Sequence, residues 1–329
     1  MSKQDAYHPP VTITPSILRL VADISEAAGR ISTRTENAPD LRLRRINRIR
    51  TIQGSLAIEG NRLSEEQITA ILDGKRVAAP LREIREARNA IAAYDRLEEW
   101  SPYSESDLLT AHGILMAGLV DGAGRYRSGG VGVTRGGRIL HMAPPARRVP
   151  VLMSDLLRWL ASTDFHLLVA GSVFHYEFEF IHPFSDGNGR MGRLWQTLIL
   201  CRWNAHFSGI PVESLICEHQ SDYYETIRKS TGRADSSPFI EFMLRMIQDA
   251  VRTLDTPQVT PQVTPQVKRL LEVLSGEMTR DELMAALGLK DRKSFRERYI
   301  RPALEKGLIG MTFPDRPNSR LQRYKAVYR

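Results

Sequence analysis

The sequence predicts a mainly α-helical protein. Apolar residues recur at spacings of three and four through most of the 329 residues, as on one face of a helix, and runs that alternate apolar and polar residues are scarce. Two helical segments open with a capping pattern, in which Ser or Thr is followed three residues later by Glu or Gln. At this length we expect two or three domains.

Composition narrows the class of protein. Hydrophobic residues make up 42% of the chain and charged residues 26%, as in soluble globular proteins. No apolar run approaches the roughly 20 residues of a membrane span, and the polar N-terminus lacks a signal-peptide core, so we expect a cytoplasmic protein. Cys201 and Cys217 lack metal-ligand spacing and predict reduced, structural thiols, although a disulfide between them stays open.

The net charge of +8 lies mostly in the last quarter of the chain. Residues 256–329 hold 15 Lys and Arg against 8 Asp and Glu, a local net charge of +7. This asymmetry indicates a nucleic acid or an acidic protein as a partner of the C-terminal region, and fits a solvated basic surface equally well.

Residues 1–100 are predicted to form an N-terminal helical region that follows a polar, proline-punctuated arm. Ile17, Leu20 and Ile24 recur at helical spacing, and Ser64 with Gln67 has the form of a capping box. We expect helices from Ser16, from Leu41 to Ile58 with Asp40 as its cap, from Ser64, and from Leu81 to Trp100.

Residues 101–254 are predicted to form a second, mostly helical region. Its predicted helices cover residues 104–119, 148–162, 165–180 and 190–200, a stretch that opens at Ser221, and residues 239–254. Between the first two, Val131, Val133, Ile139 and Leu140 flank Gly136-Gly137. Paired glycines between short β-type runs favour a tight hairpin over a floppy surface loop.

The segment from His182 to Arg193 reads His-Pro-Phe-Ser-Asp-Gly-Asn-Gly-Arg-Met-Gly-Arg and carries the densest set of chemically active side chains. Gly187, Asn188 and Gly189 form a turn that opens into a helix. Successive N–H groups at the positive end of a helix bind anions. This segment therefore predicts an anion-binding site.

Arg190 and Arg193 lie on one face of the first turn of this helix. The helix dipole disfavours each cation there by roughly 0.3–1 kcal/mol, which indicates that the helix mouth is built around a bound polyanion. Asp186 suits a magnesium ion that neutralises phosphate, and His182, with a reference pKa of about 6.5, suits a base at neutral pH. These residues predict a nucleotide-transfer site.

The segment resembles the motif of the Fic family (Fic/Doc fold), His-x-Phe-x-Asp/Glu-Gly-Asn-Gly-Arg-x-x-Arg. The specified positions are matched by His182, Phe184, Asp186, Gly187, Asn188, Gly189, Arg190 and Arg193. The resemblance implies a Fic-type helical core and a protein adenylyltransferase, which transfers AMP from ATP to a Ser, Thr or Tyr hydroxyl. It implies His182 as base, Asp186 as Mg²⁺ ligand and Phe184 as an apolar anchor. The implied phosphate-binding residues are Gly187, Asn188, Gly189, Arg190, Gly192 and Arg193.

The segment from Ser55 to Asn61 resembles the Fic inhibitory motif, Ser/Thr-x-x-x-Glu-Gly/Asn. The resemblance implies that Glu59 pairs with Arg193, so that ATP binds with its α-phosphate misplaced. An ordinary helix that ends with Gly60 as its C-cap is the alternative. In some relatives this glutamate also supports removal of AMP, and the sequence leaves that second activity open.

Two other segments resemble Fic features. The predicted hairpin resembles the flap that holds the target as an added strand, which implies a docking role for Val131, Val133, Ile139 and Leu140. The pair Tyr223-Tyr224 resembles a position that lines the adenosine site, with core packing as the alternative.

Residues 255–267 contain Thr-Pro-Gln-Val three times, and prolines every four residues favour an extended linker. Residues 268–329 then form their own domain, with helical stretches over 267–274, 279–287 and 295–306, followed by two strand candidates. This order resembles a winged helix-turn-helix domain. Its third helix, with Arg292, Lys293, Arg296 and Arg298 near its start, implies contact with DNA or with protein.

The leading hypothesis is an autoinhibited adenylyltransferase with ATP and a target protein as partners and Mg²⁺ as cofactor. The alternative is a DNA-binding regulator whose Fic core senses a nucleotide. Dimerisation, the target and the signal that releases Glu59 stay open. His175 and His182 lack a third metal ligand, and spacing assigns no role to the other histidines, His112 among them.

Overall fold

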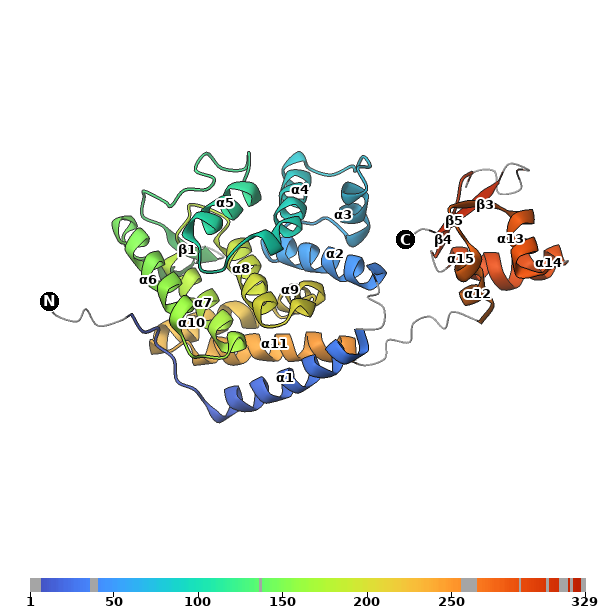
Figure 1. Cartoon of the computed structure of the whole chain (residues 1–329). Helices are drawn as coiled ribbons and strands as arrows, with labels where there is room; N and C mark the ends of the chain where they lie inside the picture. The colour runs from blue at the N-terminus through green and yellow to red at the C-terminus, as the bar shows by residue number, and fades with distance from the viewer. Residues whose placement is uncertain are drawn as a thin grey trace. The chain divides into compact units, whose positions relative to one another are not determined.

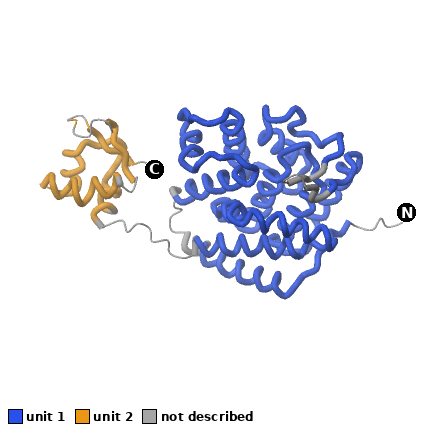
Figure 2. The backbone as a smooth tube through the Cα atoms, turned by 180° about the vertical axis from the view of Figure 1, so that it is seen from behind, with its two compact units in different colours: residues 1–256 blue, residues 257–329 orange. Residues whose placement is uncertain are grey.

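The computed structural model describes residues 7–35, 41–135, 138–255, 265–289, 291–305, 308–313, 319 and 322–326. Most of these residues are helical and the strands are few and short, so the predicted mainly α fold is confirmed. The chain divides into two compact units, residues 1–256 and 257–329, each with its own hydrophobic core (Figure 2).

The first unit is an assembly of helices with one β-hairpin (Figure 1). Its helices are α1 (Pro15–Thr35), α2 (Leu41–Ile58), α3 (Glu65–Leu72), α4 (Leu81–Asp95), α5 (Glu105–Leu115), α6 (Val149–Ser162), α7 (Leu167–Ile181), α8 (Asn188–Trp203), α9 (Val212–Glu218), α10 (Gln220–Arg233) and α11 (Ser237–Asp255). Short 3₁₀ turns lie at Leu97–Glu99, Ala146–Arg148 and Ala205–Gly209. The capping box predicted at Ser64 and Gln67 is present at the start of α3.

Helices α7 and α8 form the centre of this unit. Most residues of both helices are buried, and the two pack against each other. A helix that is buried on all sides belongs to the interior of a domain. The motif from His182 to Arg193 joins these two helices, and therefore rests on the most firmly enclosed part of the fold.

The predicted hairpin forms. Strands β1 (Gly132–Arg135) and β2 (Arg138–Met142) pair antiparallel, with Gly132 opposite Met142 and an irregularity between Val133 and Thr134. The expected Gly136-Gly137 turn lies outside the described residues, and so do the side-chain positions of Val133, Ile139 and Leu140.

The second unit combines helices with a small antiparallel sheet. In chain order it has α12 (Pro265–Val273), β3 (Glu277–Thr279), α13 (Arg280–Leu287), α14 (Arg292–Phe295), a π turn (Arg296–Ile300), α15 (Arg301–Glu305), β4 (Ile309–Met311) and β5 (Arg323–Ala326). The strands lie in the order β3-β5-β4. A capping box at Thr279 opens α13, with Glu282 as its third residue.

Three boundaries differ from the sequence-based expectations. Helix α12 begins at Pro265, inside the predicted linker, because a proline is tolerated at the first position of a helix. The predicted third helix is interrupted by the π turn before Pro302, whose missing N–H removes one regular helical hydrogen bond. Helix α4 ends at Asp95 and a 3₁₀ turn follows it, so the helix does not reach Trp100.

Strand β3 was not predicted, because three residues are too few to show alternation. Within the described ranges, no helix combines the length and the apolarity needed to cross a lipid bilayer.

Candidate active site

The loop between α7 and α8 begins with a histidine in an unusual backbone conformation. His182 ends α7 in the left-handed region, with φ 49° and ψ 63°. Non-glycine residues adopt this region rarely and at an energetic cost, so the surrounding structure must hold it. Pro183 follows directly, and a residue before proline is disfavoured in the right-handed helical region. His182 therefore cannot simply continue the helix.

Arg127 holds this backbone in place. Its Nε donates to the carbonyl of His182 at 2.7 Å and its Nη2 to the carbonyl of Ile181 at 3.2 Å. The same guanidinium donates to the carbonyls of Gly129 (2.9 Å) and Pro144 (2.6 Å), which flank the hairpin. One buried arginine thus ties the base of the hairpin to the loop that carries His182. The sequence did not predict this role, because a single arginine outside any motif gives no pattern that indicates its four carbonyl partners.

The rest of the loop is closed by Asn188 and Phe184. The Asn188 side chain accepts from the Phe184 N–H and donates to the Phe184 carbonyl, both at 2.9 Å. Phe184 is fully buried and stacks on the ring of His112, with centroids 3.6 Å apart and planes 3° apart. Phe184 is therefore an apolar anchor in this structure. Asn188 closes the loop with its side chain, and its backbone begins α8.

His112 is a second residue that spacing did not reveal. Its Nδ1 accepts from the Gly124 N–H at 2.9 Å, which leaves Nε2 as the donor to the Asp186 carbonyl at 3.0 Å. Burial lowers the pKa of His112 to about 4, so the ring is neutral near pH 7. A neutral imidazole with one donor and one acceptor connects the segment after α5 to the motif loop.

Arg193 is 2% exposed and is held by the end of α2. Its Nη2 donates to Glu59 Oε1 at 2.8 Å and to the Ser55 carbonyl at 3.0 Å, and its Nε donates to Ser55 Oγ at 3.2 Å. Burial acts to lower the pKa of Arg193, but the Glu59 carboxylate more than reverses this, and the net shift of the pKa is upward. Glu59 follows the last residue of α2, and Gly60, with φ 90°, ends the helix as a C-cap glycine would.

The Glu59 carboxylate lies over the first turn of α8. A Cβ built on Gly189 would collide with Glu59 Oε1 and would approach Arg193 Nη1 to 3.0 Å. Glycine at 189 therefore leaves the space in which this carboxylate rests against the helix N-terminus. Among the described residues, Arg193 Nη1 and Arg190 Nε are buried donors without a hydrogen-bond partner. Unpartnered buried donors beside a helix N-terminus fit a site for a further anion.

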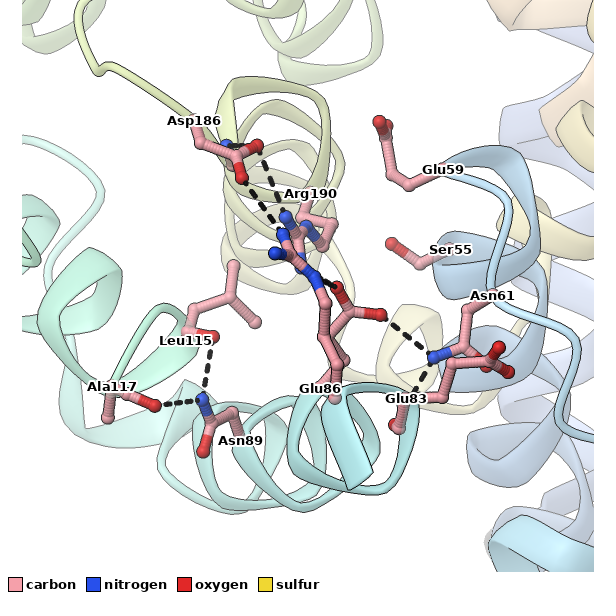
Figure 3. Close-up of polar contacts among 12 residues, drawn as sticks. Ser55, Glu59, Asn61, Glu83, Glu86, Asn89, Leu115, Ala117, Asp186 and Arg190 are labelled. Carbon is pink, nitrogen blue, oxygen red and sulfur yellow. Dashed lines mark hydrogen bonds and ion pairs between the residues drawn. The ribbon is translucent and has the colours of Figure 1, made fainter. Parts of the chain in front are cut away.

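Arg190 is held by a second set of carboxylates (Figure 3). Its Nη1 lies 3.5 Å from Glu86 Oε1, and its Nη2 lies 3.4 Å from Asp186 Oδ1. Asn61, two residues after Glu59, donates to Glu86 Oε2 at 2.9 Å. The segment that carries Glu59 is therefore linked through α4 to the other arginine of the motif.

Asp186 is the most exposed of the residues that pair with Arg190, and 43% of its side chain is accessible to solvent. Its Oδ1 accepts from the Gly187 N–H at 2.6 Å, and Arg82 Nη2 lies 3.5 Å from Oδ2. Gly187 has φ 84° and its α-carbon faces Met116 so closely that a Cβ would collide with the sulfur. No cluster of three potential metal ligands occurs in the described ranges. A single exposed carboxylate nevertheless fits Mg²⁺, which commonly takes one protein carboxylate, phosphate oxygens and water.

The two tyrosines predicted near the adenosine differ in position. Tyr223 is 1% exposed and its hydroxyl lies 3.0 Å from His175 Nε2, so this ring belongs to the core. Tyr224 is partly exposed, and of the pair only Tyr224 offers a face to a ligand. Gly192 likewise faces the protein interior, because a Cβ there would meet His175 Cδ2 at 2.8 Å.

Two family models match this chain. The model described as the Fic/DOC family matches residues 102–200, and the Fic-like C-terminal domain model (filamentation induced by cAMP protein Fic-like) matches residues 265–326. A crystal structure of a Fic family protein from Desulfovibrio desulfuricans G20 is 54% identical, with a TM-score of 0.77, and the match covers 98% of this chain and 99% of that one. The chain belongs to the Fic family.

Curated Fic relatives match a smaller part of the chain. A protein adenylyltransferase Fic from Nematostella vectensis is 30% identical over 220 residues, which cover 62% of this chain and 47% of the relative. A protein of the same name from Aedes aegypti is 31% identical over 220 residues, which cover 63% of this chain and 41% of the relative. The match thus spans less than half the length of these relatives.

The Fic motif is gathered at one place in the fold. Arg193 and Gly189 of α8 contact the Glu59 carboxylate, and Arg190 pairs with Asp186 at the start of the same helix. His182 ends α7, at the other end of the motif. A Fic motif in this arrangement can hold an anion at a helix N-terminus beside an imidazole that can accept a proton.

Proposed function

We propose that this Fic family chain is a protein adenylyltransferase, which transfers AMP from ATP to a Ser, Thr or Tyr hydroxyl of a protein. The observation that carries the proposal is the carboxylate of Glu59 bound to Arg193 above Gly189. A carboxylate already lies at the N-terminus of α8, where a helix attracts anions. Arg190 Nε and Arg193 Nη1 have no hydrogen-bond partner among the described residues and could bind a second anion. The adenylyltransferase relatives from N. vectensis and A. aegypti support the same class of reaction.

The phosphates of ATP would bind at the N-terminus of α8. Backbone N–H groups of the turn from Gly187 to Gly189 would take phosphate oxygens, and Arg190 and Arg193 would take the β- and γ-phosphates. Asp186 would hold Mg²⁺, which offsets the phosphate charge when bound. In the structure Arg82 is the cation nearest to Asp186 Oδ2, at 3.5 Å.

His182 would act as the base. Its imidazole takes the proton of the target hydroxyl as the hydroxyl oxygen bonds to the α-phosphorus, and the bond from that phosphorus to pyrophosphate breaks. The strained backbone at His182, held by Arg127, fixes the ring relative to the phosphate site. The hairpin of β1 and β2 would position the target as an added strand, through Val131, Val133, Ile139 and Leu140.

Glu59 would make the resting enzyme autoinhibited. While its carboxylate occupies Arg193, the γ-phosphate loses its cation and ATP binds with the α-phosphate misplaced for attack. Ser55 would assist, because it holds the same guanidinium from α2. The Glu59 carboxylate would also support removal of AMP from a modified protein, as the inhibitory glutamate does in some Fic enzymes.

Incubation with ATP and Mg²⁺ tests the reaction itself. We expect a mass spectrum of the intact Glu59→Gly protein to show the addition of AMP, and label from α-labelled ATP to appear on protein. γ-Labelled ATP should leave no label, because pyrophosphate departs. Label from the γ-position would instead indicate a kinase and contradict the proposal.

A basic groove in the second unit favours a second candidate function, DNA binding. The groove encloses about 840 Å³ between the segment from α14 to α15 and the sheet. Its cationic lining residues are Arg280, Arg292, Lys293, Arg296 and Arg301, and its acidic ones are Asp281 and Glu297. The excess of exposed cations in one concave surface fits a phosphate backbone.

Fluorescence anisotropy of the full chain with a labelled DNA duplex tests this candidate. If four of these cations contact phosphates, the logarithm of the binding constant should fall with the logarithm of salt concentration with a slope of about −3 to −4. Arg292→Glu with Arg296→Glu should weaken binding at least tenfold. Arg228→Glu, an exposed residue of the first unit, is the matched control. Equal binding by all three proteins would exclude the groove as a DNA site.

A further inference from the structure

A buried glutamate stands between the two central helices and is not part of the Fic motif. Glu179 lies on the last turn of α7, three residues before His182, and its side chain is 10% exposed. Its Oε2 lies 3.8 Å from His182 Nδ1, and its Oε1 lies 4.0 Å from His175 Nε2. Oε1 is buried and has no hydrogen-bond partner among the described residues. An ionisable group in this position needs an explanation, because burial of a carboxylate is costly.

The contacts of Glu179 place its carboxylate beside His182, and the second histidine beside it, His175, does not pair with it as a cation. His175 is fully buried and its Nδ1 lies 2.5 Å from Gln196 Oε1, so that its Nε2 accepts from the Tyr223 hydroxyl and carries no proton. Burial lowers the pKa of His175 to about 3, and the ring is neutral. Gly192 of α8 closes the other side, since a Cβ there would come within 3.2 Å of Glu179 Oε1.

We propose that Glu179 is a positioning residue for His182. In this proposal, which rests on the proposed transfer reaction, the Glu179 carboxylate accepts the Nδ1–H of His182 and leaves the lone pair of Nε2 toward the target hydroxyl. The 3.8 Å separation closes by a small rotation of either side chain. When Nε2 takes the hydroxyl proton, the imidazole becomes a cation and the nearby carboxylate stabilises it. A carboxylate that hydrogen-bonds to one ring nitrogen of a histidine orients the ring, so that the other nitrogen can act as the base.

The ionisation of Glu179 depends on the inhibitory segment. Burial raises the pKa of Glu179 to about 7, Arg193 opposes this shift and Glu59 adds to it. The charged or titratable groups that face Glu179 are thus Glu59 from the end of α2, His175 and His182 from α7, Arg193 from α8 and Tyr223 from α10. Departure of Glu59 from Arg193 removes a negative charge, lowers the pKa of Glu179 and favours the ionised form that orients His182. Departure of Glu59 would therefore both free Arg193 for a phosphate and favour the ionised Glu179 that orients His182.

Nitrogen-15 NMR of the histidine rings tests the proposal without nucleotide or target. In the Glu59→Gly protein we expect His182 to carry its proton on Nδ1. In Glu59→Gly with Glu179→Gln, the pKa of His182 should fall by about one unit, because an opposite charge within about 4–6 Å is lost. The matched control is Glu177→Gln, a buried glutamate two residues earlier on α7 that accepts from the Tyr7 hydroxyl at 2.7 Å. It should leave the His182 titration unchanged.

Kinetics give the second readout. We expect Glu179→Gln in the Glu59→Gly background to lower kcat at least tenfold with KM for ATP unchanged, and Glu177→Gln to change neither. The melting temperature of Glu179→Gln should be no lower than that of its parent. Above pH 7 the parent buries an ionised carboxylate, and the raised pKa of Glu179 means that this ionised form destabilises the fold. An unchanged His182 titration in Glu179→Gln would overturn the proposal. If no variant transferred AMP while the titration shifted, the proposed function would fail and the placement of Glu179 would stand.

Discussion

Replacement of His182 by alanine in the Glu59→Gly background is expected to lower AMP transfer by about 10²–10⁴-fold, the contribution of a general base. The side chain is 16% exposed, so its loss would remove the proposed proton acceptor without emptying the core. The proposed phosphate contacts come from α8 and would stay intact. ATP binding, measured by calorimetry, should therefore change less than threefold.

The control for this prediction is a histidine outside the site. His219→Ala removes an exposed ring that pairs with Asp222, and the rate of transfer should stay at that of the parent protein. Transfer that survives in His182→Ala at the parent rate would refute the assignment of the base. Loss of both transfer and ATP binding would instead indicate that His182 supports the shape of the site.

Replacement of Glu59 by glycine is expected to raise transfer by about ten- to a hundredfold, because hydrogen bonds to charged groups contribute about 1.5–3 kcal/mol and every 1.4 kcal/mol corresponds to about tenfold. The substitution removes the carboxylate that accepts from Arg193 Nη2 at 2.8 Å, and leaves the Ser55 carbonyl as the partner of this atom. Initial rates with α-labelled ATP measure the effect. Glu66→Gln, on the exposed start of α3, should leave the rate unchanged. Equal rates in Glu59→Gly and the wild type would argue against autoinhibition.

The same variant has a thermodynamic signature. Loss of one partner from a buried ion pair destabilises a fold, because the remaining charge stays uncompensated. Arg193 is 2% exposed, so Glu59→Gly should melt below the wild type in the absence of nucleotide. ATP with Mg²⁺ should raise the melting temperature of the variant more than that of the wild type, since it supplies the missing anion.

Local patterns predicted much of this molecule. The capping boxes at Ser64 and Thr279 begin helices as expected, because a cap depends on residues only three apart. The motif from His182 to Arg193 specified a loop and a helix start for the same reason. The pairing of Glu59 with Arg193 crosses 134 positions, and only the family resemblance connected the two.

The residues that support the loop escaped prediction. His112, Arg127 and Glu179 each act on it through contacts that depend on how separate helices pack, and a single side chain far away in sequence carries no periodic signal of such a contact. Glu179 is close in sequence, but a glutamate on the last turn of a helix ordinarily faces solvent. Its burial follows from the packing of α7 against α8, which periodicity does not specify.

Gly189 connects the contact between Glu59 and Arg193 to the proposed phosphate site. A glycine in a helix costs roughly 1 kcal/mol relative to alanine, and here the missing methyl is the space into which the Glu59 oxygen fits. Alanine at this position would place a methyl group where the Glu59 oxygen lies, so the Glu59 carboxylate would have to shift from its place against Arg193. In the proposed function, phosphate oxygens would approach the backbone of the same turn, so one substitution at position 189 would change both the inhibitory contact and the phosphate site.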